Sequence, residues 1–164
     1  MRGTLILMTA FLAVATCLAT PAGAAEVDTQ AANEAVVLRM MRDVFDHHDL
    51  AALDRVMVEG YAQHNPVMPQ GREGFRAYLQ ATFAAVPDWH FELRKSAAQG
   101  DLVWTYGAYV GTQRGSWAGI PATGRAFSMD AADIWRVADG QVVEHWDVLD
   151  IAGLLRQLGV GRSP

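Results

Sequence analysis

Between Phe127 and Asp150, ionisable side chains occupy a stretch that otherwise reads as apolar. Asp133, His145 and Asp147 stand among tryptophans and valines. Burying such groups costs free energy unless they are paired or functional. An apolar pocket raises the pKa of a carboxyl group, which suits it to remove a proton beside a carbonyl group or to donate to an enolate oxygen. Asp133 is therefore a candidate general acid or base.

Each candidate residue also has a purely structural interpretation. Asp133 could form an ion pair with Arg125 or Arg136, since such pairs also shift pKa values. His145 could orient Asp133, relay a proton or polarise a carbonyl group, or it could simply be hydrogen-bonded within a sheet. His64 lies in a proline-flanked loop, where it could form a pocket rim or only a turn. We take Asp133, His145 and His64 as the candidate catalytic residues.

A β-hairpin that turns at Asp139 and Gly140 is expected to bring these groups together, because Asp-Gly between apolar runs is a strong hairpin signal. A two-residue loop would place Asp133 opposite Trp146. A three-residue loop, with Gly140 as its left-handed bulge residue, would place Asp133 opposite His145. We favour the three-residue loop, because it collects the polar side chains into one cluster.

The rest of the chain predicts the elements that hold this hairpin. Apolar residues recur every three or four positions over 31–47 and 71–85, which indicates two amphipathic helices. Asp49 could cap a short helix between them, which Gly60 would end. Further along the period becomes two, with a central strand over 102–112, and a short last helix ends at Gly159. This order predicts an α+β domain, in which a curved antiparallel sheet and N-terminal helices over one face enclose a pocket.

Composition favours one exported domain. The 164 residues carry a net charge of −5 and no basic stripe, which argues against nucleic-acid binding. A basic residue, a short apolar run and a small-residue site indicate a cleaved signal peptide over 1–24, followed by a spacer over 25–30 and a single domain over 31–160. We expect a periplasmic or secreted protein with no membrane contact beyond the signal segment. The single cysteine lies in that segment, so the mature chain would have no thiolate.

Other reaction classes find no support in the sequence. It contains no closely spaced metal-binding motif, no nucleophile elbow and no phosphate-binding glycine loop, so we expect neither a metal nor a cofactor. Several aromatic residues could line a pocket for an apolar or polycyclic ligand, although core packing also explains most of them. Trp117, in a glycine-rich loop, is the best candidate for a mobile contact at the pocket mouth.

Five motifs in order resemble the SnoaL-like polyketide cyclase family. They lie at residues 61–66 (YAQHNP), 71–75 (GREGF), 119–125 (GIPATGR), 133–136 (DIWR) and 144–147 (EHWD). The resemblance extends over about 36–159. This family belongs to the nuclear transport factor two-like (cystatin-like) superfamily, which also contains ketosteroid isomerase. The resemblance implies a cone-shaped α+β barrel with a buried apolar pocket, often a homo-oligomer, and usually no metal or organic cofactor.

The resemblance also implies roles for particular residues. The family's polyketide cyclases perform an intramolecular aldol condensation in which one pocket aspartate is the general acid/base, and Asp133 matches that position. His145 and Asp147 fall on the last strand that faces the pocket. His64 and Asn65 match the loop in which ketosteroid isomerase carries its base. Neither is an aspartate, which argues against isomerase chemistry with that base.

Two hypotheses follow from these features. The first is an exported enzyme without a cofactor, which would use Asp133, His145 and His64 for an aldol-type cyclisation, isomerisation or related enolate step on a small apolar carbonyl compound. The predicted ligand contacts are Asn65, Asp147 and Trp117. The second is a non-catalytic periplasmic ligand-binding or assembly module, which export favours because polyketides are normally cyclised in the cytoplasm. An open apolar cavity with Asp133 at its floor would favour the enzyme, and a filled one a structural role.

Overall fold

The computed structural model describes residues 22–160 of the chain, so almost all of the predicted signal peptide lies outside the described residues. The elements in order are α1 (Ala22–Met40), a π-helical turn η1 (Met41–Asp46), a 3-10 turn η2 (Leu50–Ala52), α2 (Leu53–Val56), β1 (Met57–Gln63), α3 (Gly71–Ala85), β2 (His90–Gln99), β3 (Leu102–Thr112), β4 (Ala126–Ala138), β5 (Gln141–Leu149) and α4 (Ile151–Leu158). Within this part of the chain, no helix is long and apolar enough to cross a membrane.

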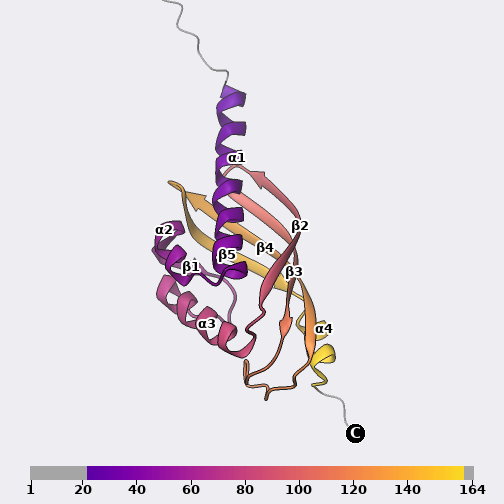
Figure 1. The fold of residues 1–164 in the computed structure, drawn as a ribbon. Coiled ribbons are helices and arrows are strands. Elements are labelled where there is room, and N and C mark those ends of the chain that lie inside the picture. Colours follow the sequence, from indigo (N-terminus) through magenta and orange to yellow (C-terminus); the bar gives the residue numbers. More distant parts are fainter. Residues whose placement is uncertain (1–21, 161–164) are drawn as a thin grey trace, which may run out of the picture.

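Five strands form one curved sheet in the order β1-β5-β4-β3-β2. α1 lies across the sheet, α2 and α3 cover its β1 side, and α4 packs against β4 (Figure 1). The predicted α+β architecture is confirmed, with one correction: β1 runs parallel to β5, so the sheet is mixed rather than antiparallel throughout. β1 reaches the edge of the sheet after the first helices and has no hairpin partner that would impose an antiparallel direction.

The first helix begins earlier than the sequence pattern indicates. Its apolar face is buried as predicted: the residues are Val36, Val37, Met40, Met41, Val44 and Phe45. α1, however, starts at Ala22, so the predicted spacer over 25–30 is helical. This segment contains no proline or glycine that would stop a helix. It shows no apolar stripe because the start of α1 projects beyond the sheet (Figure 1).

The second helix, by contrast, is shorter than predicted. Asp49 caps it as expected, since its carboxylate accepts a hydrogen bond from the backbone N–H of Ala51. The helix ends at Val56 rather than near Gly60, because β1 already begins at Met57.

The predicted hairpin forms from β4 and β5 with a two-residue turn. Asp139 and Gly140 both have positive φ angles, 49° and 75°, and Ala138 pairs with Gln141. Two positive φ angles are typical of the turn type that matches the twist of a hairpin. The favoured three-residue loop is therefore wrong.

A β-bulge then changes the register in a way that neither predicted loop includes. Val143 is the extra residue on β5, and beyond it Asp133 lies opposite Asp147 and Trp135 opposite His145. Directly paired residues share a face of the sheet, as do residues two positions apart on one strand. All four side chains therefore lie on the concave face, and the polar cluster forms through a different register.

Candidate functional site

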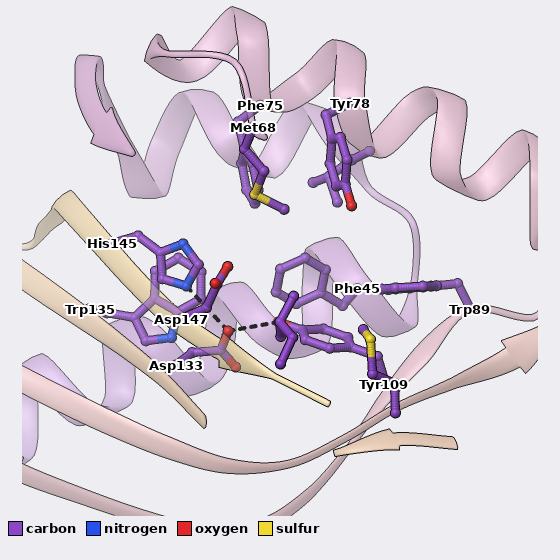
Figure 2. Close-up of a pocket in the computed structure, with 13 residues that line it drawn as sticks. Phe45, Met68, Phe75, Tyr78, Trp89, Tyr109, Asp133, Trp135, His145 and Asp147 are labelled. Carbon is purple, nitrogen blue, oxygen red and sulfur yellow. Dashed lines mark hydrogen bonds and ion pairs between the residues drawn. The ribbon is translucent and has the colours of Figure 1, made fainter. Parts of the chain in front are cut away.

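The concave face of the sheet and α3 enclose a narrow apolar space, here called the inner cleft. Its volume is about 30 Å³, which is room for roughly one water molecule. Figure 2 shows Asp133, His145 and Asp147 close together on one side, with Phe75 and Tyr78 of α3 across from them. The cleft itself is therefore too small for a ring system.

A second and larger space, the outer cavity, adjoins the inner cleft. Its volume is about 790 Å³, within the usual range of small-molecule sites. Four residues line both spaces: Tyr78, Met129, Asp147 and Leu149. Most of the remaining wall is apolar and includes Trp117, and the predicted ligand contact Asn65 also lies there. A ring system fits the outer cavity, with Asp147 at the junction.

Asp133 is the most deeply buried carboxyl group of the site, with only 1% of the residue exposed. Its Oδ1 lies 3.2 Å from Nε2 of His145 and accepts a hydrogen bond of 3.2 Å from the hydroxyl group of Tyr109. Burial raises the pKa of Asp133, the hydrogen bond with His145 opposes this shift, and the nearby charge of Asp147 adds to it. The direction agrees with the expectation for a carboxyl group in an apolar pocket.

Neither Arg125 nor Arg136, the two arginines considered as ion-pair partners of Asp133, contacts its carboxyl group. Arg136 forms ion pairs with Glu144 and Asp101, at 2.7 Å and 2.6 Å, on the opposite face of the sheet. Arg125 donates to the backbone oxygen of Gln157. Among the described residues, the Asp133 carboxyl group is thus bonded to the imidazole of His145 and to the hydroxyl groups of Tyr109 and Thr105, not to a guanidinium group.

His145 is fixed on both ring nitrogens and on one ring face. Its Nδ1 lies 3.1 Å from Nε2 of Gln63, and its ring stacks on Trp135 with 3.7 Å between the ring centroids and 12° between the planes. Only 2% of the residue is exposed. The imidazole is thus held in one orientation toward Asp133.

Asp147 faces Asp133 across the hairpin and is less buried. Both of its carboxylate oxygens accept from the side-chain amide of Asn65, at 2.9 Å. One ligand-type atom each from Asp133, His145 and Asp147 lies within 4.8 Å of the others. Two carboxylates and an imidazole are atoms that a divalent cation can bind, yet each already has hydrogen-bond partners in the protein. The absence of a metal stays a prediction.

The structure does not bring His64 to this site. Its Nε2 lies 2.7 Å from Oε1 of Glu144, and its ring stacks on Trp146 with 4.5 Å between centroids. The physical reason is strand alternation: Gln63 pairs with His145 and shares its face, so the next residue points to the other face. Gln63 is the site residue that the sequence analysis missed, although the alternation of buried Tyr61 and Gln63 along β1 could have indicated it.

Trp117 lies in the wall of the outer cavity as a packed residue. Its indole N–H lies 3.3 Å from the hydroxyl oxygen of Thr82, and its ring stacks on Phe127. With 8% of the residue exposed, it is part of the core. It can contact a ligand without acting as a mobile lid.

Comparisons with known proteins agree on one family. A family model described as SnoaL-like polyketide cyclase matches residues 35–158. Aklanonic acid methyl ester cyclase DnrD of Streptomyces peucetius is 35% identical over 101 residues, which are 61% of this chain and 69% of that protein. Nogalonic acid methyl ester cyclase of Streptomyces nogalater is 33% identical over 82 residues, 50% of this chain and 60% of that protein. The structure of TsrD from Streptomyces laurentii superposes with a TM-score of 0.73 at 32% identity, covering 79% of this chain and 96% of that one.

Proposed function

We propose that this chain, which belongs to the SnoaL-like polyketide cyclase family and has the nuclear transport factor two-like fold, catalyses an aldol-type ring closure in a polycyclic carbonyl compound. The observation that carries the proposal is the meeting of Asp133, Asp147 and His145 where the inner cleft opens into the outer cavity. The two related cyclases act, by their names, on methyl esters of aklanonic and nogalonic acid.

Ring closure of this kind requires a base and an acid at one place. A base removes a proton from the carbon beside a carbonyl group, and the resulting enolate carbon forms a bond with a second carbonyl carbon. The oxygen of that second carbonyl becomes an alkoxide, which must receive a proton. The number of protons does not change, so the enzyme needs no oxidant or reductant and ends each cycle as it began.

The two aspartates can supply both roles by sharing one proton. Carboxyl groups this close do not both ionise readily, because the second charge would face the first in an apolar site. Asp133 has the raised pKa, while Asp147 receives hydrogen bonds on both oxygens. One member of the pair is then a carboxylate that takes the substrate proton, and the other is an acid that returns a proton to the alkoxide.

The sizes of the two spaces support a placement for the substrate. In this proposal the apolar rings occupy the outer cavity, and the reacting edge points toward Asp147 and the inner cleft; the volume and apolar lining of the outer cavity support this. The low polarity around the aspartates strengthens their interaction with a developing alkoxide or enolate charge. His145 orients Asp133 and Asn65 orients Asp147.

A second candidate function is ligand binding without turnover. It is favoured by the small inner cleft and by the 1% exposure of Asp133, which leave the outer cavity as the main space for a ligand. A periplasmic or secreted location, which we propose from residues 1–24, would fit a binding module. A homo-oligomer, proposed from the family resemblance, is compatible with either function.

One experiment separates the two functions. The purified protein is mixed with aklanonic acid methyl ester, binding is followed by tryptophan fluorescence, and ring closure by chromatography and mass spectrometry. We expect the wild-type protein to bind and to close the ring, and Asp147→Asn to bind with at least about a 100-fold lower kcat. Binding by the wild-type protein without ring closure of this ester or of related polyketide esters would favour the binding module.

A further inference from the structure

We infer that Gln63 is a positioning residue that holds the imidazole of His145 in one tautomer, with its hydrogen on Nε2 and directed at Asp133. Gln63 belongs to the YAQHNP motif, where the histidine attracts attention and the glutamine does not. The catalytic consequence rests on the proposed function, whereas the effect of Gln63 on the imidazole does not.

The main chain at Gln63 is fixed on β1 next to the site. Gln63 pairs with His145 of β5, and only 3% of the residue is exposed. The side chain of Gln70 bonds to both backbone groups of Gln63: its Oε1 accepts from the Gln63 N–H at 3.0 Å, and its Nε2 donates to the Gln63 oxygen at 2.5 Å. Gln63 therefore presents its side chain to His145 from a backbone that is held at both polar groups.

The orientation of the Gln63 amide follows from its neighbours. The backbone N–H of Asn65, which can only donate, lies 2.9 Å from Oε1. The groups around Nε2 can all accept: Nδ1 of His145 at 3.1 Å, the Tyr61 oxygen at 2.9 Å and the Met68 sulfur at 3.1 Å. A flipped amide would place its N–H against the Asn65 N–H, so the observed orientation is the one that satisfies these groups.

This orientation determines where the imidazole carries its hydrogen. Nδ1 faces the Nε2 amino group of Gln63, which has no acceptor to offer. A hydrogen on Nδ1 would be unpaired there, so the hydrogen of the neutral ring is on Nε2. Nε2 lies 3.2 Å from Oδ1 of Asp133. His145 therefore donates to Asp133, and a second hydrogen on Nδ1 would meet an N–H of Gln63.

The other titratable groups around His145 act in opposing ways. Asp133 and Asp147 would both favour a doubly protonated imidazolium ring. Burial raises the pKa of Tyr61 and Tyr109, so their hydroxyl groups stay protonated and add no charge. Gln63 is the neighbour that opposes the imidazolium form.

Gln63 also connects the two carboxyl groups. Its Oε1 receives the backbone N–H of Asn65, whose side-chain amide holds Asp147. His145 holds Asp133 at the other end of the same chain of hydrogen bonds. A change at Gln63 is thus expected to affect both members of the aspartate pair, although Gln63 itself lines neither space.

The test is a long-range ¹H–¹⁵N NMR experiment on the imidazole nitrogens of the ¹⁵N-labelled protein, with His145→Gln to assign the signals. In the wild type near neutral pH we expect Nε2 protonated and Nδ1 unprotonated. In Gln63→Glu the new carboxylate can accept from Nδ1, so both nitrogens should be protonated. In Gln63→Met, which has no amide, the two neutral tautomers should become mixed or the imidazolium should appear.

The matched control is a change of the same kind away from the site. Gln141→Glu adds the same charge at the start of β5, away from the site, and should leave the His145 signals unchanged. A wild-type ring protonated on Nδ1 would overturn the inference, as would an unchanged His145 pattern in both Gln63 variants. If the enzyme closes rings, Gln63→Glu should lower kcat about tenfold with little change in KM. Failure to find turnover would leave the NMR result, and the positioning role, standing.

Discussion

Two histidine–carboxylate pairs lie on opposite faces of the sheet, and each includes at least one residue of the β4–β5 hairpin. On the concave face, His145 and Asp133 are 3.2 Å apart, with side-chain exposures of 3% and 1%. On the other face, His64 and Glu144 are 2.7 Å apart, with exposures of 41% and 25%. Each histidine also stacks on a tryptophan. The residue types are nearly the same, so the comparison isolates the effect of the surroundings.

The surroundings shift the two carboxyl groups in opposite directions. Burial raises the pKa of Asp133. The hydrogen bond from Arg136, followed by that from His64, lowers the pKa of Glu144. A carboxyl group next to an arginine and water remains ionised and forms an ordinary surface ion pair. Of these two pairs, only the buried one is suited to hold a proton for acid/base chemistry. Burial, and not the residue types alone, therefore separates the candidate catalytic pair from the surface ion pair.

The largest expected difference between the two faces is in catalysis. Asp133→Asn should lower kcat at least about 100-fold, because the acid/base pair loses one member. Glu144→Gln, a matched change on the other face, should leave kcat within about twofold. Steady-state kinetics with the methyl ester probe, on variants whose circular dichroism matches the wild type, would measure both. Equal losses of kcat in the two variants would contradict an acid/base role confined to the concave face.

A change in the wall of the outer cavity should have an intermediate effect. Ala81 and Ala77 are both exposed residues of α3, but Ala81 lies in that wall and Ala77 lines neither space. Ala81→Trp should weaken binding of a polycyclic ester about tenfold, or roughly 1.4 kcal/mol, by occupying its space. Ala77→Trp should leave the Kd unchanged. Fluorescence titration would distinguish the two variants. An unchanged Kd in Ala81→Trp would show that the ligand does not bind in the outer cavity.

The smallest expected effects are on stability, and they have opposite signs for the two carboxyl groups. Because the folded-state pKa of Asp133 is raised, the folded state binds more protons than the unfolded state between the two pKa values, and its stability falls as pH rises through that window. The folded-state pKa of Glu144 is lowered, so its contribution is present above the unfolded pKa and is lost as pH falls through the folded pKa.

Urea unfolding of both variants from about pH 3 to about pH 8 would measure these signs. Relative to the wild type, Asp133→Asn should gain stability as pH rises. Glu144→Gln should be slightly less stable near neutral pH, and the difference should vanish in acid. A stability difference from the wild type that changes with pH in the same direction for both variants would contradict the opposite pKa shifts.

The elements that depend on local pattern could be predicted from the sequence. α3 and β3 have the predicted bounds, Gly71–Ala85 and Leu102–Thr112, because periodicity and helix-breaking residues act over a few positions. The parallel pairing of β1 and the bulge at Val143 depend on contacts between distant segments, which no local pattern encodes. Without the bulge, every second residue after the buried Val142 would face inward, and Trp146 would be one of them. The extra residue Val143 shifts this alternation, so His145 and Asp147 face inward instead.

The site itself was predictable only in part. Asp133, His145 and Asp147 were found because ionisable residues in an apolar stretch are unusual, and the structure brings all three together. His64 was chosen for its chemistry, although strand alternation turns it to the other face. Gln63 was missed because a neutral amide has no acid/base chemistry of its own. Its role comes from the two neighbours that it connects.

The most direct test of the account is the pKa of Asp133 compared with that of Glu144, by carboxyl-carbon NMR titration with Asp133→Asn and Glu144→Gln as assignment controls. We predict that Asp133 titrates above its ordinary value of 3.8 and Glu144 below its ordinary value of 4.5. A pKa for Asp133 at or below 3.8 would mean that the buried carboxyl group is simply ionised. The shared proton, and with it the proposed acid/base chemistry, would then be contradicted.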